Sequence, residues 1–162
     1  MTPAGDGAVA LLRHAVATVA YRGGKAVRGA PASFASFRSG ADTRTPVEIL
    51  AHVCDLFDWA LGLADGRHVW RDATPRPWHE EVARFFAALE RLDARLASSD
   101  PLGNSPEKIF QGPIADALTH IGQINLLRRM AAAPVKGENY FKADIAAGRV
   151  GADQSRPKVE FE

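Results

Sequence analysis

The chain has little cysteine and no long hydrophobic run. Its one cysteine, Cys54, leaves no internal disulfide, and a single free thiol is typical of a reducing compartment such as the cytoplasm. The apolar stretch near the N-terminus is interrupted by Arg13 and His14, and the remaining run is too short to span a bilayer. We therefore expect a cytoplasmic protein without a disulfide framework or a membrane segment.

An excess of charge of one sign is also missing. The 20 Lys and Arg residues against 19 Asp and Glu residues give a formal net charge of +1, and no face gathers basic with aromatic residues. A nucleophile elbow, a CxxC pair and a glycine-rich phosphate loop are absent as well, since the pair Gly23–Gly24 follows no strand. These absences argue against nucleic acid, an anionic membrane or a nucleotide as the partner.

The composition is that of a folded globular domain. The 162 residues include 46% hydrophobic and 24% charged residues, which suits one hydrophobic core in a single domain. We expect this domain over residues 1–150 and a polar C-terminal tail over residues 151–162. The stretch after Pro134 has room for one short helix at most.

Four segments have the apolar spacing of amphipathic helices. The first covers about residues 6–27. The second begins at Thr45, an N-cap with Pro46 at the first helical position and Glu48 completing a capping box, and ends at Asp65–Gly66. The third begins near Pro77 and carries the clearest apolar stripe. The fourth begins near Pro113 and ends at MAAAP, with a short helix PEKIF before it and a break or kink at Gly112–Pro113.

These helices predict an all-α fold, a four-helix bundle in which the apolar stripes pack together. No segment alternates with a period of two, so we expect no strand. The links over residues 28–44 and 66–76 are longer than the connections of a simple up-down bundle. Long links allow crossovers and can cover an end of the bundle.

Three polar residues lie where core residues are expected. His52 falls on the apolar stripe of the second helix, and Asp116 and His120 are one turn apart on the fourth. A bundle brings such inward faces together, so two imidazoles and one carboxylate could hold a divalent ion and leave positions for water or substrate. Alternatively, Asp116 lies in the first turn of the fourth helix, where the helix dipole alone stabilises a carboxylate. His52 would then be a hydrogen-bonded core residue.

Other side chains are candidates for supporting roles. Gln123, one turn after His120, either supports the site or is an ordinary polar residue of the bundle. The loop WRDATPRPWH could place Trp70 and Trp78 in a pocket for an anionic or planar ligand, or use them to cover a bundle end. Tyr140 follows the fourth helix closely enough to fold over a bundle end. Cys54 is expected to be packed.

Two motifs resemble the DinB/YfiT-like superfamily of bacterial four-helix bundles. These are TPVEILAHVCDLFDWAL around His52 and DALTHIGQINLLRR around His120, and the resemblance extends over about residues 5–135. It implies an up-down-down-up bundle, often a homodimer, with a divalent metal held by three His residues at one bundle end. His52 matches the ligand of the second helix and His120 the second ligand of the fourth, while Asp116 stands where the family has a His.

The carboxylate in place of an imidazole changes the expected chemistry. It lowers the charge of the metal site from +2 to +1, so that bound water is less acidified. It also shifts the preference from zinc toward nickel, iron or manganese. The ion could equally have been lost, leaving an Asp116–His120 hydrogen bond.

Two functions from different classes follow. The first is a metal-dependent enzyme that acts on a small molecule, by thiol S-transferase-like chemistry with a low-molecular-weight thiol or by hydrolase-like chemistry. The second is a non-catalytic helical module that binds a small molecule or a partner and carries a degenerate metal site.

Overall fold

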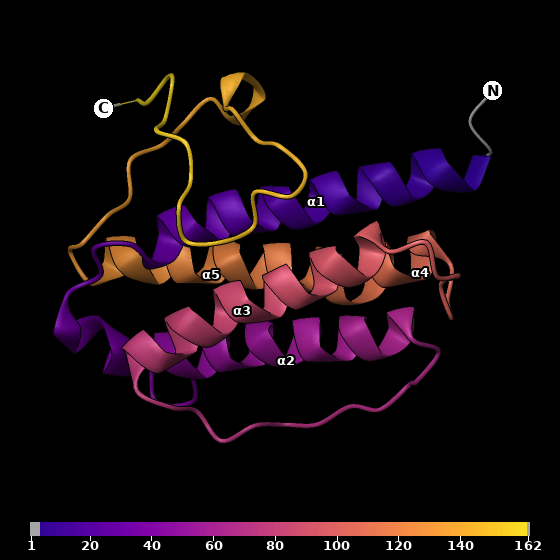
Figure 1. Ribbon diagram of the computed structural model, residues 1–162. Helices are drawn as coiled ribbons and strands as arrows, with labels where there is room; N and C mark the ends of the chain where they lie inside the picture. The colour runs from indigo at the N-terminus through magenta and orange to yellow at the C-terminus, as the bar shows by residue number, and fades with distance from the viewer. Residues whose placement is uncertain (1–3, 162) are drawn as a thin grey trace.

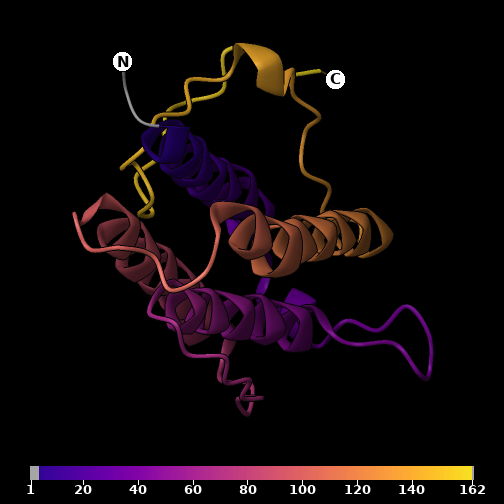
Figure 2. The ribbon, with the colours of Figure 1, turned by 90° about the vertical axis from the view of Figure 1, so that its right-hand side faces the viewer.

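The computed structural model describes residues 4–161 and is all-helical over them. Four long helices form its body: α1 (Ala4–Val27), α2 (Pro46–Ala64), α3 (Trp78–Ala97) and α5 (Ala115–Met130). Each packs against two of the others, in the cyclic order α1, α3, α2, α5, which the turned view in Figure 2 makes visible. Within residues 4–161 there is no strand, only one isolated bridge between Glu138 and Glu160.

The predicted stripes form the core that this ring encloses. Its largest fully buried members come from every long helix and include Val16, Val19, Phe57, Phe85, Leu89, Leu92 and Ile124. Gly23 explains the glycine pair inside α1, because a Cβ at this position would lie 2.5 Å from the Phe85 ring. The glycine therefore allows α1 and α3 to approach closely. No helix in residues 4–161 is both long enough and apolar enough to cross a membrane.

The capping box predicted for α2 is confirmed. Thr45 Oγ1 accepts from the Glu48 backbone N–H, and Glu48 Oε2 accepts from the Thr45 backbone N–H at 2.6 Å. These bonds satisfy free N–H groups of the first turn and fix the start of the helix. Because His52 lies in the second turn, the cap also fixes the height at which its imidazole leaves α2.

The sequence predicts a break or kink at Gly112–Pro113, and the chain does not break there, although a π-helical segment interrupts the regular α-helix. Helix α4 (Pro106–Ile109) continues through the π-helical segment η2 (Phe110–Ile114) directly into α5. Pro113 has no N–H to donate and would clash with a carbonyl of a regular α-helical turn. The wider π turn accommodates the ring without ending the helix, so Asp116 lies inside a continuous helix.

Two long segments cover the bundle. The link over residues 65–77 runs along α2 for most of its length, and the C-terminal segment over residues 131–161 returns across α1 (Figure 1). A short 3-10 helix, η1 (Ala32–Ser36), precedes α2 and places Phe34 in the core, and a second one, η3 (Tyr140–Lys142), lies in the C-terminal segment.

The C-terminal segment is fixed to α1 by four side chains, which we call the C-terminal clasp: Tyr21, Lys25, Glu138 and Glu160. Tyr21 donates to Glu138 Oε1 at 2.5 Å, and Lys25 Nζ donates to Glu138 at 2.7 Å and to Glu160 at 2.8 Å. The Glu138 side chain has no exposed surface. Residues 151–161, expected as a polar tail, thus have a defined path.

Candidate metal centre

His52, Asp116 and His120 meet between α2 and α5. The Nε2 atoms of His52 and His120 lie 3.6 and 3.5 Å from the two carboxylate oxygens of Asp116. The two imidazole rings are edge to face, with centroids 4.7 Å apart. One ligand atom from each residue lies within 4.8 Å of the other two. The structure therefore brings together the three residues that the helical spacing selected.

These separations are compatible with ligands around a metal ion. At 3.5 and 3.6 Å the two N···O pairs are longer than the usual hydrogen-bond range. Two ligand atoms that each lie about 2.1 Å from a tetrahedral ion are roughly 3.4 Å apart. The group can thus bind a divalent ion with small side-chain movements.

Gln123 orients one of the imidazoles. Its Oε1 lies 2.7 Å from His120 Nδ1, and because an amide oxygen only accepts, Nδ1 carries the ring proton. The lone pair of His120 is then on Nε2, the nitrogen that faces Asp116. A partner on the far nitrogen that fixes the tautomer is the usual support of a metal-ligating histidine.

Burial and nearby charge favour the neutral form of His52. The pKa of His52 is lowered from its ordinary value, chiefly by burial and further by the electrostatic influence of the neighbouring His120 and Arg44 side chains, although Asp116 opposes the shift. Only a neutral imidazole can ligate a metal ion. The surroundings of His52 therefore favour the form that binds.

The continuous helix removes one alternative explanation for Asp116. A carboxylate in the first turn of a helix is stabilised by free backbone N–H groups. Asp116 instead follows α4 and the π-helical turn, where the preceding backbone is already helical. Its side chain is 46% exposed and accepts no hydrogen bond from a backbone N–H within residues 4–161, so the helix dipole does not account for its position.

Indole rings lie on one side of the centre. Trp70 packs against the His52 ring with centroids 5.4 Å apart, and Trp59 contacts Trp70 at 5.8 Å and stacks on His68 at 5.5 Å. The link that carries Trp70 is fixed by backbone N–H groups of Ala73 and Arg76, which donate to buried Asp55 and Glu81. Trp70 is thus the tryptophan that reaches the site.

Trp78 and Tyr140 lie elsewhere. Trp78 packs edge to face on Phe34 at 5.6 Å, and Tyr140 packs on Tyr21 and lies under the Arg22 guanidinium. Neither contacts the three ligands in the described part of the chain. Cys54 is fully buried and its thiol donates to the Glu81 carbonyl; burial raises its pKa, in agreement with a packed residue.

Two hollows open beside the centre. On the Asp116 side, a hollow of about 450 Å³ is lined by Trp59, Gln111, Gly112, Ala115, Asp116 and Thr119. On the His120 side, a hollow of about 440 Å³ has Arg44 and Met130 in its walls. The sequence reading missed Trp59 and Arg44. Trp59 could have been found, since it follows His52 by two helical turns on the same face.

No family model matches the chain, and no match to it was found among curated proteins or solved structures. What the centre does is therefore inferred from its geometry and from the motifs around His52 and His120.

Proposed function

We propose that this chain is a metal-dependent enzyme of the DinB/YfiT-like type, in which His52, Asp116 and His120 hold a divalent ion. The observation that carries the proposal is the convergence of two Nε2 atoms on the Asp116 carboxylate, with Gln123 fixing the tautomer of His120. Three protein ligands leave coordination positions for a substrate or water.

The course of the chain supports the same assignment. In Figure 1 the chain follows α1 from right to left, α2 and α3 from left to right, and α5 from right to left. That order is the up-down-down-up arrangement of the family, and the link over residues 65–77 is the crossover between α2 and α3 that it requires. By the same resemblance we propose a cytoplasmic homodimer that acts on a small molecule.

The chemistry that fits best is thiol transfer, with hydrolysis as the close relative. When bound, a divalent ion supplies Lewis acidity, which stabilises a thiolate or acidifies water. Asp116 lowers the charge of the site to +1, so that one thiolate makes it neutral. This charge balance favours a low-molecular-weight thiol over hydroxide, and nickel, iron or manganese over zinc.

The protein side chains would orient and shield the reactants. Gln123 keeps the His120 proton on Nδ1, and Trp70 covers the His52 ring and excludes water from that side. The hollow beside Asp116 gives a substrate access to the open side of the carboxylate. Its indole wall, Trp59, suits a planar electrophile.

Metal content tests the proposal directly. Protein purified without added metal and analysed for transition metals should carry close to one ion per chain. The His52→Ala and His120→Ala variants should carry almost none, whereas His79→Ala, which changes an exposed histidine outside the group, should keep the ion. Absence of metal after dialysis against zinc, nickel and manganese would contradict the proposal, as would ion content unchanged by the ligand substitutions.

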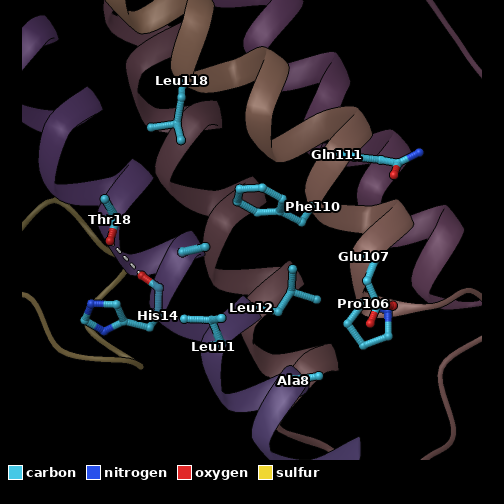
Figure 3. A pocket seen from close by; sticks show the side chains of 11 residues that line it. Ala8, Leu11, Leu12, His14, Thr18, Pro106, Glu107, Phe110, Gln111 and Leu118 are labelled. Atoms are coloured by element: carbon cyan, nitrogen blue, oxygen red, sulfur yellow. Dashed lines mark hydrogen bonds between the residues drawn. The ribbon is translucent and has the colours of Figure 1, made fainter.

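A second function is favoured by a separate cavity. Figure 3 shows an apolar cavity of about 560 Å³ between α1 and the α4–α5 helix, with Leu11, Leu12, Phe110 and Leu118 in its walls and His14 and Gln111 at its edge. Its size and composition are those of a small-molecule site. If the metal analysis fails, this cavity makes a non-catalytic binding module the better assignment.

A further inference from the structure

The hollow on the His120 side has two chemically different walls. Arg44 and Ser39 come from the link before α2, and Leu126 and Met130, which are 57% and 51% exposed, come from α5. His120 also lines it, so the hollow reaches one of the three ligand residues. A volume of about 440 Å³ suits a small organic molecule.

The Arg44 guanidinium has no partner among residues 4–161. No hydrogen bond or ion pair joins it to Asp42 or Glu48, the acidic residues nearest in the sequence. Glu48 instead accepts from the backbone and hydroxyl of Thr45. In contrast, Arg38 of the same loop donates to the Thr43 carbonyl at 2.6 Å and lies 3.9 Å from Glu48. Arg44 is therefore the guanidinium of this loop that can bind a ligand.

The loop that carries Arg44 is held by its own hydrogen bonds. Thr43 Oγ1 donates to the Gly40 carbonyl at 2.8 Å and accepts from the Gly40 N–H at 3.1 Å. The loop projects from the bundle beside α2, at the right of Figure 2, and the capping box of α2 follows Arg44 directly. The backbone position of Arg44 is thus fixed by the Gly40–Thr43 hydrogen bonds before it and by the capping box of α2 after it.

No acidic side chain lines this hollow, so Arg44 has no carboxylate beside it within the lining. The lining contains one cation, Arg44, together with hydroxyl, imidazole and amide groups and apolar side chains. A carboxylate can accept two parallel hydrogen bonds from a guanidinium. Leu126 and Met130 on the other wall offer exposed hydrocarbon for the rest of such a molecule.

We propose that this hollow binds a small amphipathic anion, with its carboxylate on Arg44 and its hydrocarbon part on Leu126 and Met130. The inference rests on the proposed function, because it makes this molecule the substrate or the thiol cofactor that approaches the metal centre from the His120 side. The acceptable ligands are thereby narrowed to small carboxylic acids. Neutral and cationic analogues are disfavoured.

Titration with hexanoate, followed by amide chemical shifts in NMR spectra, tests this inference. Hexanol and hexylammonium are the neutral and cationic controls, and the metal-free protein is used so that the carboxylate cannot bind an ion. Hexanoate should bind about fivefold more tightly than hexanol, as expected for a partly exposed ion pair. The shifts should map to residues 39–44 and 120–130.

Two variants assign the preference to Arg44. Arg44→Gln should remove the advantage of hexanoate over hexanol, and Arg44→Glu should reverse it in favour of hexylammonium. Arg38→Gln, a change of the neighbouring arginine, should keep the preference of the wild type. Equal affinities for hexanoate and hexanol, a preference that survives Arg44→Gln, or shifts confined to the cavity between α1 and α4 would each overturn the inference.

Metal content keeps this outcome separate from that of the proposed function. Arg44→Gln should bind as much metal as the wild type, because Arg44 is not one of the three ligands. If the wild-type protein binds metal but shows no preference for hexanoate, the anion site is wrong and the metal centre stands. If the wild-type protein prefers hexanoate but binds no metal, the anion site stands and the metal centre is wrong.

Discussion

The metal centre and the C-terminal clasp are both clusters of carboxylates with basic groups, yet their polar atoms are satisfied in different ways. In the clasp, both oxygens of Glu138 accept hydrogen bonds of 2.5 and 2.7 Å from Tyr21 and Lys25. In the metal centre, the oxygens of Asp116 face imidazole nitrogens at 3.5 and 3.6 Å. The clasp is closed by its own side chains, whereas the candidate metal centre has a spacing compatible with ligands around an ion.

The comparison contrasts a structural cluster with one that we propose to be functional. A buried polar network whose members all have partners stabilises one conformation. Partly exposed ligand atoms that converge without bonding each other contribute little to stability and remain able to bind. The following predictions test that distinction, beginning with the largest expected effect.

Removal of one carboxylate should lower the free energy of unfolding much more in the clasp than in the candidate metal centre. Glu138→Ala should lower the free energy of unfolding by about 3 kcal/mol, because it leaves buried Lys25 and Tyr21 short of a partner. Asp116→Ala should change it by less than about 0.5 kcal/mol, as is usual for a surface substitution. Equilibrium urea unfolding of metal-free protein measures both. Equal costs would make the metal centre a second structural cluster.

Metal should stabilise the wild type through the three ligands. An ion present at 100 times its Kd should raise the free energy of unfolding by about 2.7 kcal/mol if it binds only the folded chain. The His120→Ala variant should show no such gain, and Glu138→Ala should show the full gain from its lower starting point. Urea unfolding with and without nickel or zinc gives the answer, and a gain that persists in His120→Ala would place the ion elsewhere.

Replacement of Gln123 should weaken the metal site without abolishing it. Gln123→Leu removes the acceptor on His120 Nδ1 and should lower the metal affinity by about tenfold. Gln111→Leu makes the same change on the preceding π-helical turn, where the side chain does not contact a ligand histidine, and should leave the affinity unchanged. Competition with a metal-binding dye measures both. Equal effects would show that Gln123 has no specific role.

The smallest effect concerns alkaline pH. Burial and the bond to Glu138 raise the pKa of Tyr21, and the ion pairs of Lys25 raise its pKa although burial opposes them. Since the unfolded chain releases these protons first, the stability contributed by the clasp is complete below about pH 10 and decreases above it. In Tyr21→Phe the decrease should be shallower. Unfolding at pH 8 to 11 measures the slopes, and identical slopes would exclude Tyr21 as a contributor.

Much of the fold could be predicted because it depends on local signals. The apolar stripes, the Thr45–Glu48 capping box and the ends of α2 and α3 are encoded within a few residues of where they act. The continuous helix through Pro113 could not be predicted from such local signals. Proline usually ends a helix, whereas here a π-helical turn accommodates it, and Ile109 before the turn and Ile114 within it are buried in the core.

The convergence of the three candidate ligands was predictable for a related reason, and their surroundings were not. His52 and the pair Asp116–His120 lie on regular helices, so their directions follow from the helical period. Trp70 and Arg44 lie in links whose paths depend on contacts with distant residues, such as the bond from the Ala73 N–H to Asp55. Contacts with distant residues also decide the position of Trp78, which packs on Phe34 and not beside His52, Asp116 and His120.

The π-helical turn also gives the chain a simple route for change. A π-helical turn contains one residue more than an α-helical turn, so η2 is equivalent to an α-helix with a one-codon insertion. Loss of that codon would rotate Phe110 and Pro106 by about 100° around the helix axis relative to Asp116 and His120. The extra residue of η2 therefore sets how the Pro106 and Phe110 side of the apolar cavity in Figure 3 is oriented relative to Asp116 and His120.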